Sequence, residues 1–260
     1  MEGPQAVTEA VAATEAEPGS LLELFVTAPA ADSHAALLAR AQAAGVPLTL
    51  VSGEVLAALA ATVTPQGVVG VAAHRDIPLE TALAGPPSLL VVLAAVRDPG
   101  NAGTVLRAAD AAGADAVVFT GDSVDAYNAK CVRASAGSLF HLPFAIDVPA
   151  PTVVEAASAA GLQVLAAAGD APEDLFGAGV SGKLGRPTAW LFGNEAWGLP
   201  AELRRQADRS VRVRIYGRAE SLNLAAAAAI CLYASAQAQR APGGCRAEAL
   251  ASARNSCVAR

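Results

Sequence analysis

The sequence predicts an α/β protein with a small N-terminal α/β domain followed by a larger domain built on a parallel β-sheet. From Ser88 onward, short continuous apolar segments alternate with helical segments, which is typical of parallel strands covered by helices on both faces. Before them, residues 76–87 have the proline and glycine content of a linker. A chain of 260 residues is long enough for both units.

Composition narrows the functional classes. The chain is 53% hydrophobic and 16% charged, as in globular proteins, and its alanine-rich stretches are interrupted by polar residues before they reach the length of a membrane span. Its first residues lack the basic and apolar regions of a signal peptide. We therefore expect a soluble, cytoplasmic protein without a membrane partner.

The cysteines suggest neither a disulfide framework nor a metal site. Cys131, Cys231, Cys245 and Cys257 show no C-x-x-C spacing and have no neighbouring histidine in the sequence. Cys131 and Cys231 fall in helical patterns and are expected to be small core residues.

The small domain with its linker is assigned to residues 1–84, from apolar periodicity and from turn and cap residues. Its expected elements are a helix at 5–16, a strand at 21–27, a helix at 33–44 opened by Asp32 or Ser33, a strand at 47–51, a helix at 53–61, a turn at 64–67 and a strand at 68–73.

The large domain is assigned to residues 85–240. Strands are expected at 89–94, 116–119, 144–148, 163–166, 188–192 and 211–215, with helices at 101–113, 128–137, 151–160, from Pro200 onward, and at 222–239. Residues 241–260 have little apolar periodicity, which predicts a disordered tail.

One segment, Leu191-Phe-Gly-Asn-Glu-Ala-Trp-Gly-Leu-Pro200, has the features of a ligand-binding loop. It follows an apolar strand, and Gly193 and Gly198 allow close backbone approach to a small molecule. Glu195 stands between them among apolar neighbours and is expected to be buried, an unusual place for a carboxylate that has no partner or function. Alone, the segment is equally compatible with an ordinary strand–turn–helix connection.

A second motif, Arg97-Asp-Pro-Gly-Asn-Ala-Gly-Thr-Val-Leu-Arg107, joins the first strand of the large domain to its helix. Such a loop lies at the carboxyl end of a parallel strand, where open α/β sheets bind ligands. Asn101 is a candidate helix cap, and Arg107 would lie within reach of the same ligand-binding edge of the sheet. A helix cap with a surface arginine also explains the motif. No dinucleotide fingerprint or P-loop is present, which argues against nicotinamide and nucleotide-triphosphate enzymes.

A third motif, Glu220-Ser-Leu-Asn-Leu224, precedes the last helix. Either Ser221 or Asn223 can cap that helix, but capping does not explain both. A loop that presents amides, a hydroxyl and a carboxamide to a ligand explains the set better.

Together, Asn101 with Arg107, Gly193-Asn-Glu-x-x-Gly198, and Ser221-Leu-Asn223 resemble the three motifs of the SpoU (TrmH-like) RNA ribose 2′-O-methyltransferases of the SPOUT superfamily. The resemblance covers residues 88–239. Residues 20–75 are similar to the small substrate-binding domain of that family.

The resemblance implies a sheet whose C-terminal part forms a deep trefoil knot, an S-adenosylmethionine cofactor, and a homodimer with its active site at the subunit interface. It implies that the cofactor is bound by Leu191, Gly193, Asn194, Gly198, Ile215, Leu222 and Leu224. It implies a catalytic set of Asn101, Arg107, Glu195, Ser221 and Asn223, in which Glu195 organises its loop.

The implied reaction is attack of a ribose 2′-oxygen on the sulfonium methyl group. The family's usual proposal makes the arginine at position 107, supplied by the partner subunit, the base. A guanidinium group stays protonated because its pKa is above about 12. We therefore expect Arg107 to bind a phosphate and stabilise the developing alkoxide, while Ser221 or Asn223 orients the hydroxyl.

The charge distribution departs from the family's pattern. Its members usually carry a basic leader, whereas Met1 here directly precedes Glu2, and residues 1–74 contain one arginine against seven acidic residues. Since phosphate contacts dominate nucleic-acid affinity, this composition is unusual for an RNA-binding domain. Either the native chain starts earlier, or the arginine-rich segment 186–218 supplies the RNA contacts.

Ribosomal RNA of the 23S type is the expected substrate, ahead of transfer RNA. The alternative from another functional class is a non-catalytic RNA-binding member of the family.

Overall fold

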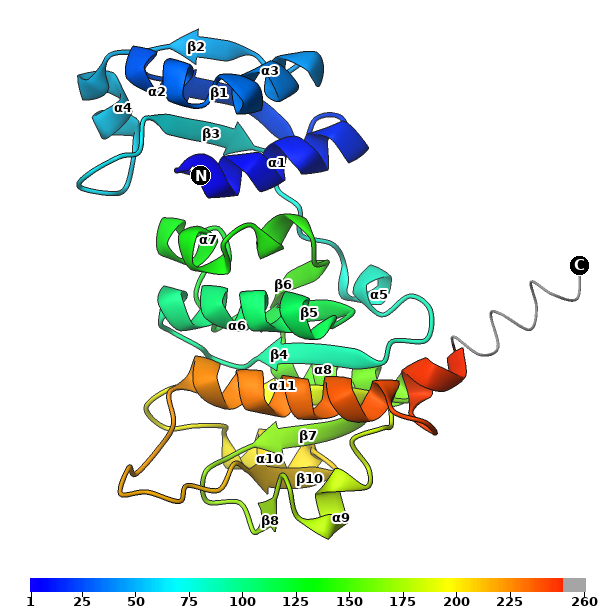
Figure 1. Ribbon diagram of the computed structural model, residues 1–260. Helices are drawn as coiled ribbons and strands as arrows, with labels where there is room; N and C mark the ends of the chain where they lie inside the picture. The colour runs from blue at the N-terminus through cyan, green and yellow to red at the C-terminus, as the bar shows by residue number, and fades with distance from the viewer. Residues whose placement is uncertain (250–260) are drawn as a thin grey trace, which may run out of the picture.

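The computed structural model describes residues 1–249, which form a small α/β unit and a larger one (Figure 1). The elements of the small unit are α1 (Pro4–Ala16), β1 (Leu21–Val26), α2 (Ala28–Ser33), α3 (Ala35–Ala43), β2 (Leu48–Leu50), α4 (Gly53–Leu59) and β3 (Val68–Ala72). Its sheet has the order β2-β1-β3, with β1 parallel to β2 and antiparallel to β3.

The single helix expected at 33–44 is wrong, because the chain forms two shorter helices there. Thr27, and neither Asp32 nor Ser33, stands at the N-cap of α2. Pro29 in the first turn favours this earlier start, since its missing N–H is not needed there. The helix then ends at His34, which has non-helical backbone angles and precedes α3.

The large unit is a parallel sheet covered by helices, as predicted, but it has seven strands instead of the six expected, and the strand expected at 211–215 lies earlier, at 209–212. Its elements are α5 (Leu79–Ala82), β4 (Leu89–Leu93), α6 (Pro99–Ala112), β5 (Ala116–Thr120), α7 (Ala129–Ser135), the 3₁₀ helix η1 (Ser138–Phe140), β6 (Phe144–Val148), α8 (Ala150–Ala159), β7 (Gln163–Ala167), β8 (Glu173–Asp174), α9 (Ala178–Ser181), β9 (Thr188–Phe192), α10 (Ala201–Gln206), β10 (Arg209–Arg212) and α11 (Leu224–Arg240). The strand order is β6-β5-β4-β9-β7-β10-β8, and every paired strand is parallel to its neighbour.

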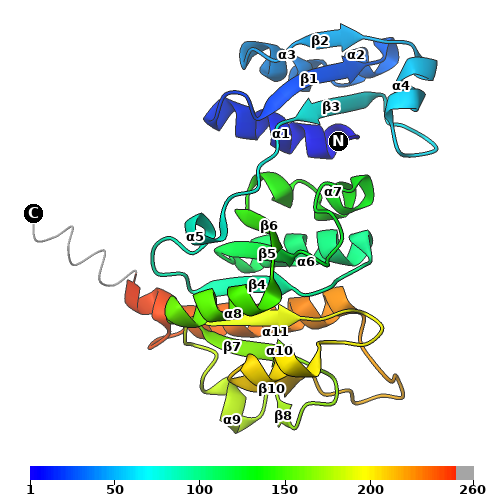
Figure 2. The same cartoon turned by 180° about the vertical axis from the view of Figure 1, so that it is seen from behind.

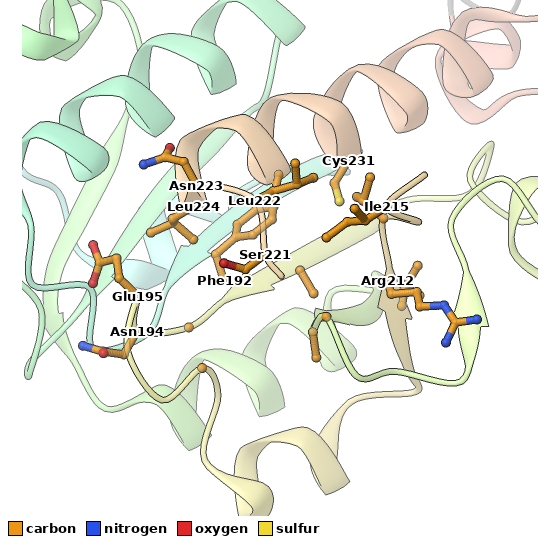
Figure 3. Close-up of a pocket in the computed structure, with 18 of the residues that line it drawn as sticks. Phe192, Asn194, Glu195, Arg212, Ile215, Ser221, Leu222, Asn223, Leu224 and Cys231 are labelled. Atoms are coloured by element: carbon orange, nitrogen blue, oxygen red, sulfur yellow. The ribbon is translucent and has the colours of Figure 1, made fainter. Parts of the chain in front are cut away.

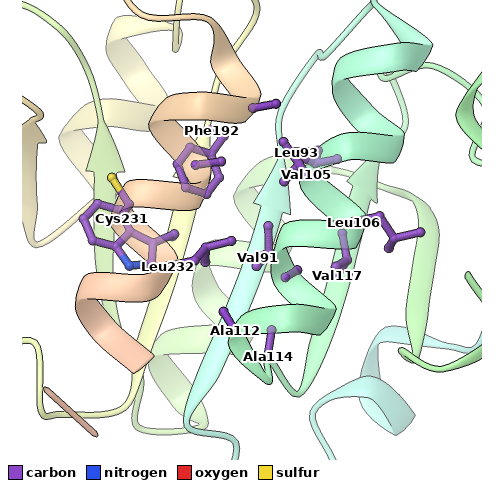
Figure 4. Close-up of a cluster of buried hydrophobic side chains, with 14 of the residues drawn as sticks. Val91, Leu93, Val105, Leu106, Ala112, Ala114, Val117, Phe192, Cys231 and Leu232 are labelled. Carbon is purple, nitrogen blue, oxygen red and sulfur yellow. The ribbon is translucent and has the colours of Figure 1, made fainter. Parts of the chain in front are cut away.

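Two apolar layers sandwich this sheet. Helices α6, α7 and α11 cover one face, and α5, α8 and α10 cover the other (Figures 1 and 2). Every residue of β4 and β9 is buried, so these two strands form the centre of the sheet. Figure 4 shows part of the layer on the α6–α11 side, including Val91, Phe192 and Leu232. In the same layer Trp190 is fully buried and donates a hydrogen bond from Nε1 to Ser235 Oγ at 2.9 Å. Cys131 and Cys231 are buried in the same layer, as expected.

The strand order brings four loops to one end of the sheet. The chain runs outward through β4, β5 and β6, and then crosses to β7, which lies on the other side of β9. Ligands bind in α/β sheets outside the carboxyl ends of strands at such reversals of strand order. The loops that follow β4, β9, β7 and β10 are therefore neighbours at the ligand-binding edge.

Polar contacts join the small unit to the large one. Tyr127 accepts hydrogen bonds from the backbone N–H groups of Arg75 and Asp76 and donates to the Asp76 carboxylate. Glu2 pairs with Arg133. The predicted linker contains α5, which packs among the apolar residues of the large unit.

Part of the segment predicted to be a disordered tail contacts the large unit. Cys245 donates its N–H to the Gly185 carbonyl at 2.9 Å, and Arg246 pairs with Asp115. Residues 250–260 of that segment lie outside the described residues. Within residues 1–249, no helix combines the length and apolar character needed to cross a membrane.

Candidate functional site

A cleft of about 590 Å³ opens at the carboxyl ends of β4, β9, β7 and β10 (Figure 3). Its walls combine apolar side chains and loop backbone with polar groups from the three motifs and from Arg212 and Arg214. Clefts of roughly 300–1,000 Å³ with such linings are typical small-molecule sites.

The loop after β9 is folded back on itself. Asn194 N donates to the Gly198 carbonyl at 3.0 Å, and Gly198 N donates to the Asn194 carbonyl at 2.9 Å. Gly198 has φ 69°, which favours glycine. A β-carbon on Gly193 would lie 2.5 Å from Leu199 N, so this closure requires glycine there as well. The buried Asn194 side chain fixes the loop to the sheet by donating to the Ala95 carbonyl at 2.7 Å.

Glu195 is exposed, so the sequence-based expectation of a buried carboxylate is wrong. Its side chain turns toward the loop after β4 and accepts hydrogen bonds from Arg97 N and Asp98 N, each at 3.2 Å, and from Asn101 Nδ2 at 3.1 Å. Partial burial raises the pKa of Glu195, but the hydrogen bonds from Asn101 and from the backbone outweigh it and hold the pKa below its ordinary value. Glu195 is therefore an ionised acceptor that joins two loops.

Asn101 extends this connection to the third motif. Its Oδ1 accepts a hydrogen bond from Asn223 Nδ2 at 2.9 Å, while its Nδ2 is bound to Glu195. Asn223 in turn caps α11 by accepting from Ala225 N at 2.8 Å. A continuous hydrogen-bonded chain from Glu195 through Asn101 to Asn223 thus links all three motifs.

Two helix starts differ from the expectations. Asp98, not Asn101, is the N-cap of α6, and its side chain accepts from Asn101 N at 2.8 Å. The last helix begins at Leu224, two residues later than expected, because Asn223 occupies the cap position. Of the two candidate caps of that helix, Asn223 takes the role and leaves Ser221 free.

The cleft collects the predicted site residues except two. Those that line it are Asn101, Gly193, Asn194, Glu195, Gly198, Ile215, Ser221, Leu222, Asn223 and Leu224. Leu191 lies in the apolar layer on the opposite face of the sheet, because alternate residues of a strand point to opposite faces. Arg107 is exposed on α6 and does not line the cleft of its own chain, contrary to the expectation of a shared ligand-binding edge.

Sequence reasoning missed several lining residues. Ala167, Ala168 and Gly169 form the wall after β7, and Phe192 and Cys231 contribute to the floor. The loop after β7 has no polar motif, and the only available signal was its position after a parallel strand. Burial raises the pKa of the Cys231 thiol to about 12, so it lines the cleft as a neutral apolar group.

The arginine-rich segment is partly neutralised. Acidic residues in and before β8 pair with three of its arginines. The pairs are Arg204 with Asp170, Arg209 with Glu173, and Arg214 with Asp174. Three of the seven arginines in residues 186–218 are therefore paired, and the segment presents less positive charge than its composition suggests.

Both units match known protein families. Residues 88–233 match the SpoU rRNA methylase family, and residues 1–77 match the RNA 2′-O ribose methyltransferase substrate-binding domain. The chain is 37% identical to the 23S rRNA (guanosine(2553)-2′-O)-methyltransferase RlmP of Bacillus subtilis, over 73% of this chain and 72% of that protein. It is 33% identical to the 23S rRNA (guanosine-2′-O-)-methyltransferase RlmB of Nitrosomonas europaea, over 83% and 84% of the two chains.

Solved structures agree with these sequence relatives. An AdoMet-bound rRNA methyltransferase from Sinorhizobium meliloti superimposes with a TM-score of 0.75 at 32% identity, over 91% of this chain and 86% of that one. The SpoU methyltransferase AviRb from Streptomyces viridochromogenes, in complex with AdoMet, superimposes with a TM-score of 0.74 at 27% identity, over 88% and 87%. The chain belongs to the SpoU rRNA methylase family, and as a member it is an RNA ribose 2′-O-methyltransferase that uses S-adenosylmethionine.

Proposed function

We propose that this protein methylates a ribose 2′-hydroxyl of 23S-type ribosomal RNA. The observation that carries the proposal is the cleft in which Glu195, Asn101 and Asn223 connect the three motif loops. The relatives described above, which act on 23S rRNA, favour ribosomal RNA over transfer RNA as the substrate.

The residues of the cleft fit S-adenosylmethionine. Leu222, Leu224 and Ile215 provide apolar surface for a flat heterocycle, while the backbone around Gly193 and Gly198 leaves room for close approach. The bound cofactor supplies an electrophilic methyl group on a sulfonium sulfur. These loops would hold the donor and exclude water, so that the two reactants are held in a fixed relative orientation.

Ser221 is the better candidate for orienting the ribose hydroxyl. Asn101 and Asn223 bond to each other, and their remaining side-chain groups serve Glu195 and the α11 cap. Ser221 lines the cleft, and its hydroxyl has no hydrogen-bond partner within residues 1–249. We assign substrate contact to Ser221, and loop positioning to Asn101, Asn223 and Glu195.

The position of Arg107 supports a homodimer. This arginine is exposed on α6 and away from its own cleft, so it can serve a second subunit packed against this helix. A surface hollow between α6 and α11 is lined mainly by apolar residues, among them the exposed rings of Phe176 and Tyr233. A second copy of the chain would cover this apolar surface.

In that dimer, Arg107 would bind a phosphate beside the target ribose and stabilise the developing alkoxide. Its guanidinium group remains protonated at neutral pH and cannot accept the hydroxyl proton. Arg107→Lys should lower the methylation rate because lysine lacks the planar set of donors. Near-normal activity of that variant would contradict this role.

The proposal extends to the finer features of the family. A trefoil knot in the C-terminal part of the sheet is consistent with β9 and β10 lying between earlier strands. A cytoplasmic location is consistent with a ribosomal RNA substrate.

The deciding experiment maps 2′-O-methylation in RNA from cells with and without the gene, and after adding purified protein and S-adenosylmethionine to the unmethylated RNA. We expect one 23S nucleotide to lose and regain its methyl group. Restoration in transfer RNA alone would change the substrate. Failure to bind S-adenosylmethionine at millimolar concentration would instead favour a non-catalytic RNA-binding role.

A further inference from the structure

The small unit has no positively charged side chain available for RNA. Arg40 forms two hydrogen bonds to the Glu15 carboxylate, from Nε at 2.9 Å and from Nη2 at 2.8 Å. Arg75 donates to Ser20 Oγ at 2.7 Å and also pairs with Glu17. These are the only arginines or lysines of residues 1–77, so the family's substrate-binding domain carries excess negative charge in this chain.

The large unit pairs six of its fourteen described arginines and lysines with carboxylates. Carboxylates hold Lys130, Arg133, Arg204, Arg209, Arg214 and Arg246. Lys183, Arg186 and Arg240 lie near the amino ends of the strands, away from the cleft, where Gln239 bonds to Ser88 and Arg186. Arg212 lines the cleft, but its Nη1 is bound to the Ala171 carbonyl at 3.1 Å, and Arg205 lies on α10. Few cations in the loops around the cleft are therefore without a side-chain partner in the described part of the chain.

Besides Arg107, two unpaired arginines lie in the loops at the cleft end of the sheet. Arg97 is exposed, and its backbone N–H is bound to Glu195 at the edge of the cleft. Arg218 is exposed in the loop between β10 and α11, which also carries the cleft residues Ile215 and Ser221. Neither side chain has a hydrogen-bond or carboxylate partner within the described part of the chain. We call Arg97 and Arg218 the rim arginines.

We propose that the rim arginines supply the principal phosphate contacts of this chain, together with Arg107, and that the small unit adds none. The inference rests on the proposed RNA substrate and assigns where its backbone is held. Neutralised phosphates release counterions, so each such contact makes RNA affinity more dependent on salt. The small unit can recognise RNA only through shape and uncharged contacts.

The test measures binding of an in vitro transcribed 23S rRNA to the full-length protein at 50 to 200 mM salt. The variants are Arg97→Gln, Arg218→Gln and the double variant. Each single change should weaken binding by about three- to tenfold and lower the slope of log affinity against log salt by about 0.7–0.9. In the double variant, the change in slope should be about twice as large.

Matched controls remove arginines that are already paired. Arg40→Gln in the small unit and Arg204→Gln in the large unit should change RNA affinity less than twofold, because their charges are held by carboxylates. S-adenosylmethionine affinity, measured by calorimetry, should stay unchanged in Arg97→Gln and Arg218→Gln, which shows that the cleft is intact.

An unchanged salt slope in the double variant would overturn the inference, as would an Arg40→Gln defect equal to that of Arg97→Gln. With either of these results, binding of 23S rRNA by the wild-type protein would leave the proposed function standing. Wild-type protein that binds no RNA would overturn the proposed function and this inference together.

Discussion

Removal of the Glu195 carboxylate should uncouple the motif loops without unfolding the protein. Glu195→Ala deletes the acceptor of three hydrogen bonds, from Arg97 N, Asp98 N and Asn101 Nδ2. The two N–H groups can bond to water because the site is exposed. We therefore expect the global fold to be retained, and the variant to lose the hydrogen bond that aligns Asn101 with Asn223.

The size of the effect follows from these contacts. An exposed hydrogen bond to a carboxylate contributes about 0.5–1 kcal/mol after competition with water, so the three together contribute roughly 1.5–3 kcal/mol. A difference of about 1.4 kcal/mol corresponds to a factor of ten. We expect Glu195→Ala to slow methyl transfer by about 10- to 100-fold, in the range reported for misplaced catalytic groups.

The assay is single-turnover methyl transfer to unmethylated 23S rRNA, with thermal unfolding measured in parallel. Glu202→Ala is the matched control, because this glutamate is exposed on α10 and has no hydrogen-bond partner within residues 1–249. The control should keep its rate within about twofold. A Glu195→Ala rate equal to wild type, with intact RNA binding, would refute the role of the hydrogen-bonded chain.

Three further changes test other parts of the structure. Hydrogen bonds to Asp110 and to Glu9, of which only Glu9 belongs to the small unit, raise the pKa of His141 above 6.5. Their contribution to stability is therefore fully present below pH 6.5 and is lost as pH rises through the raised pKa; NMR titration of His141 should show the shift, and an ordinary pKa would refute it. Gly103→Ala places a β-carbon against the α7 backbone and should lower the unfolding free energy by about 1–3 kcal/mol in denaturant titrations. Gly193→Ala should abolish cofactor binding, as measured by calorimetry, and should change the melting temperature little. The reason is that the nearest atoms to the new β-carbon are backbone atoms of Gly198 and Leu199 in the same loop.

The parallel sheet could be predicted because its signal is local and strong. Residues 89–93 and 189–192 are apolar throughout, and such runs are typical of strands buried on both faces. The short strand β8 and the helix α9 gave no comparable pattern, because a two-residue strand has no measurable periodicity. Strand order could not be derived from periodicity either, since it depends on pairing between distant segments.

The polar residues of the site could be identified from the sequence because they depart from the pattern of their neighbours, whereas the groups to which they bind could not. Glu195 stood out among apolar neighbours, and the wrong inference was burial: its side chain points outward to backbone donors of another loop. Leu191 and Phe192 are adjacent and equally apolar, yet only Phe192 faces the cleft. Which of two such neighbours faces a ligand depends on the register of the strand, and register is set by its pairing with β4 and β7.

The hydrogen-bonded chain also explains why capping alone could not account for the third motif. An N-cap uses only the side-chain oxygen, and Asn223 uses Oδ1 for this purpose. Its Nδ2 remains free to donate to Asn101. Serine at the same position has a single hydroxyl, which can accept the capping hydrogen bond but leaves no second side-chain group for Asn101. Asn223→Ser should therefore preserve α11 and break the connection to Asn101. Unchanged thermal stability with slower methyl transfer would distinguish this positioning role from simple capping, and wild-type kinetics in Asn223→Ser would contradict it.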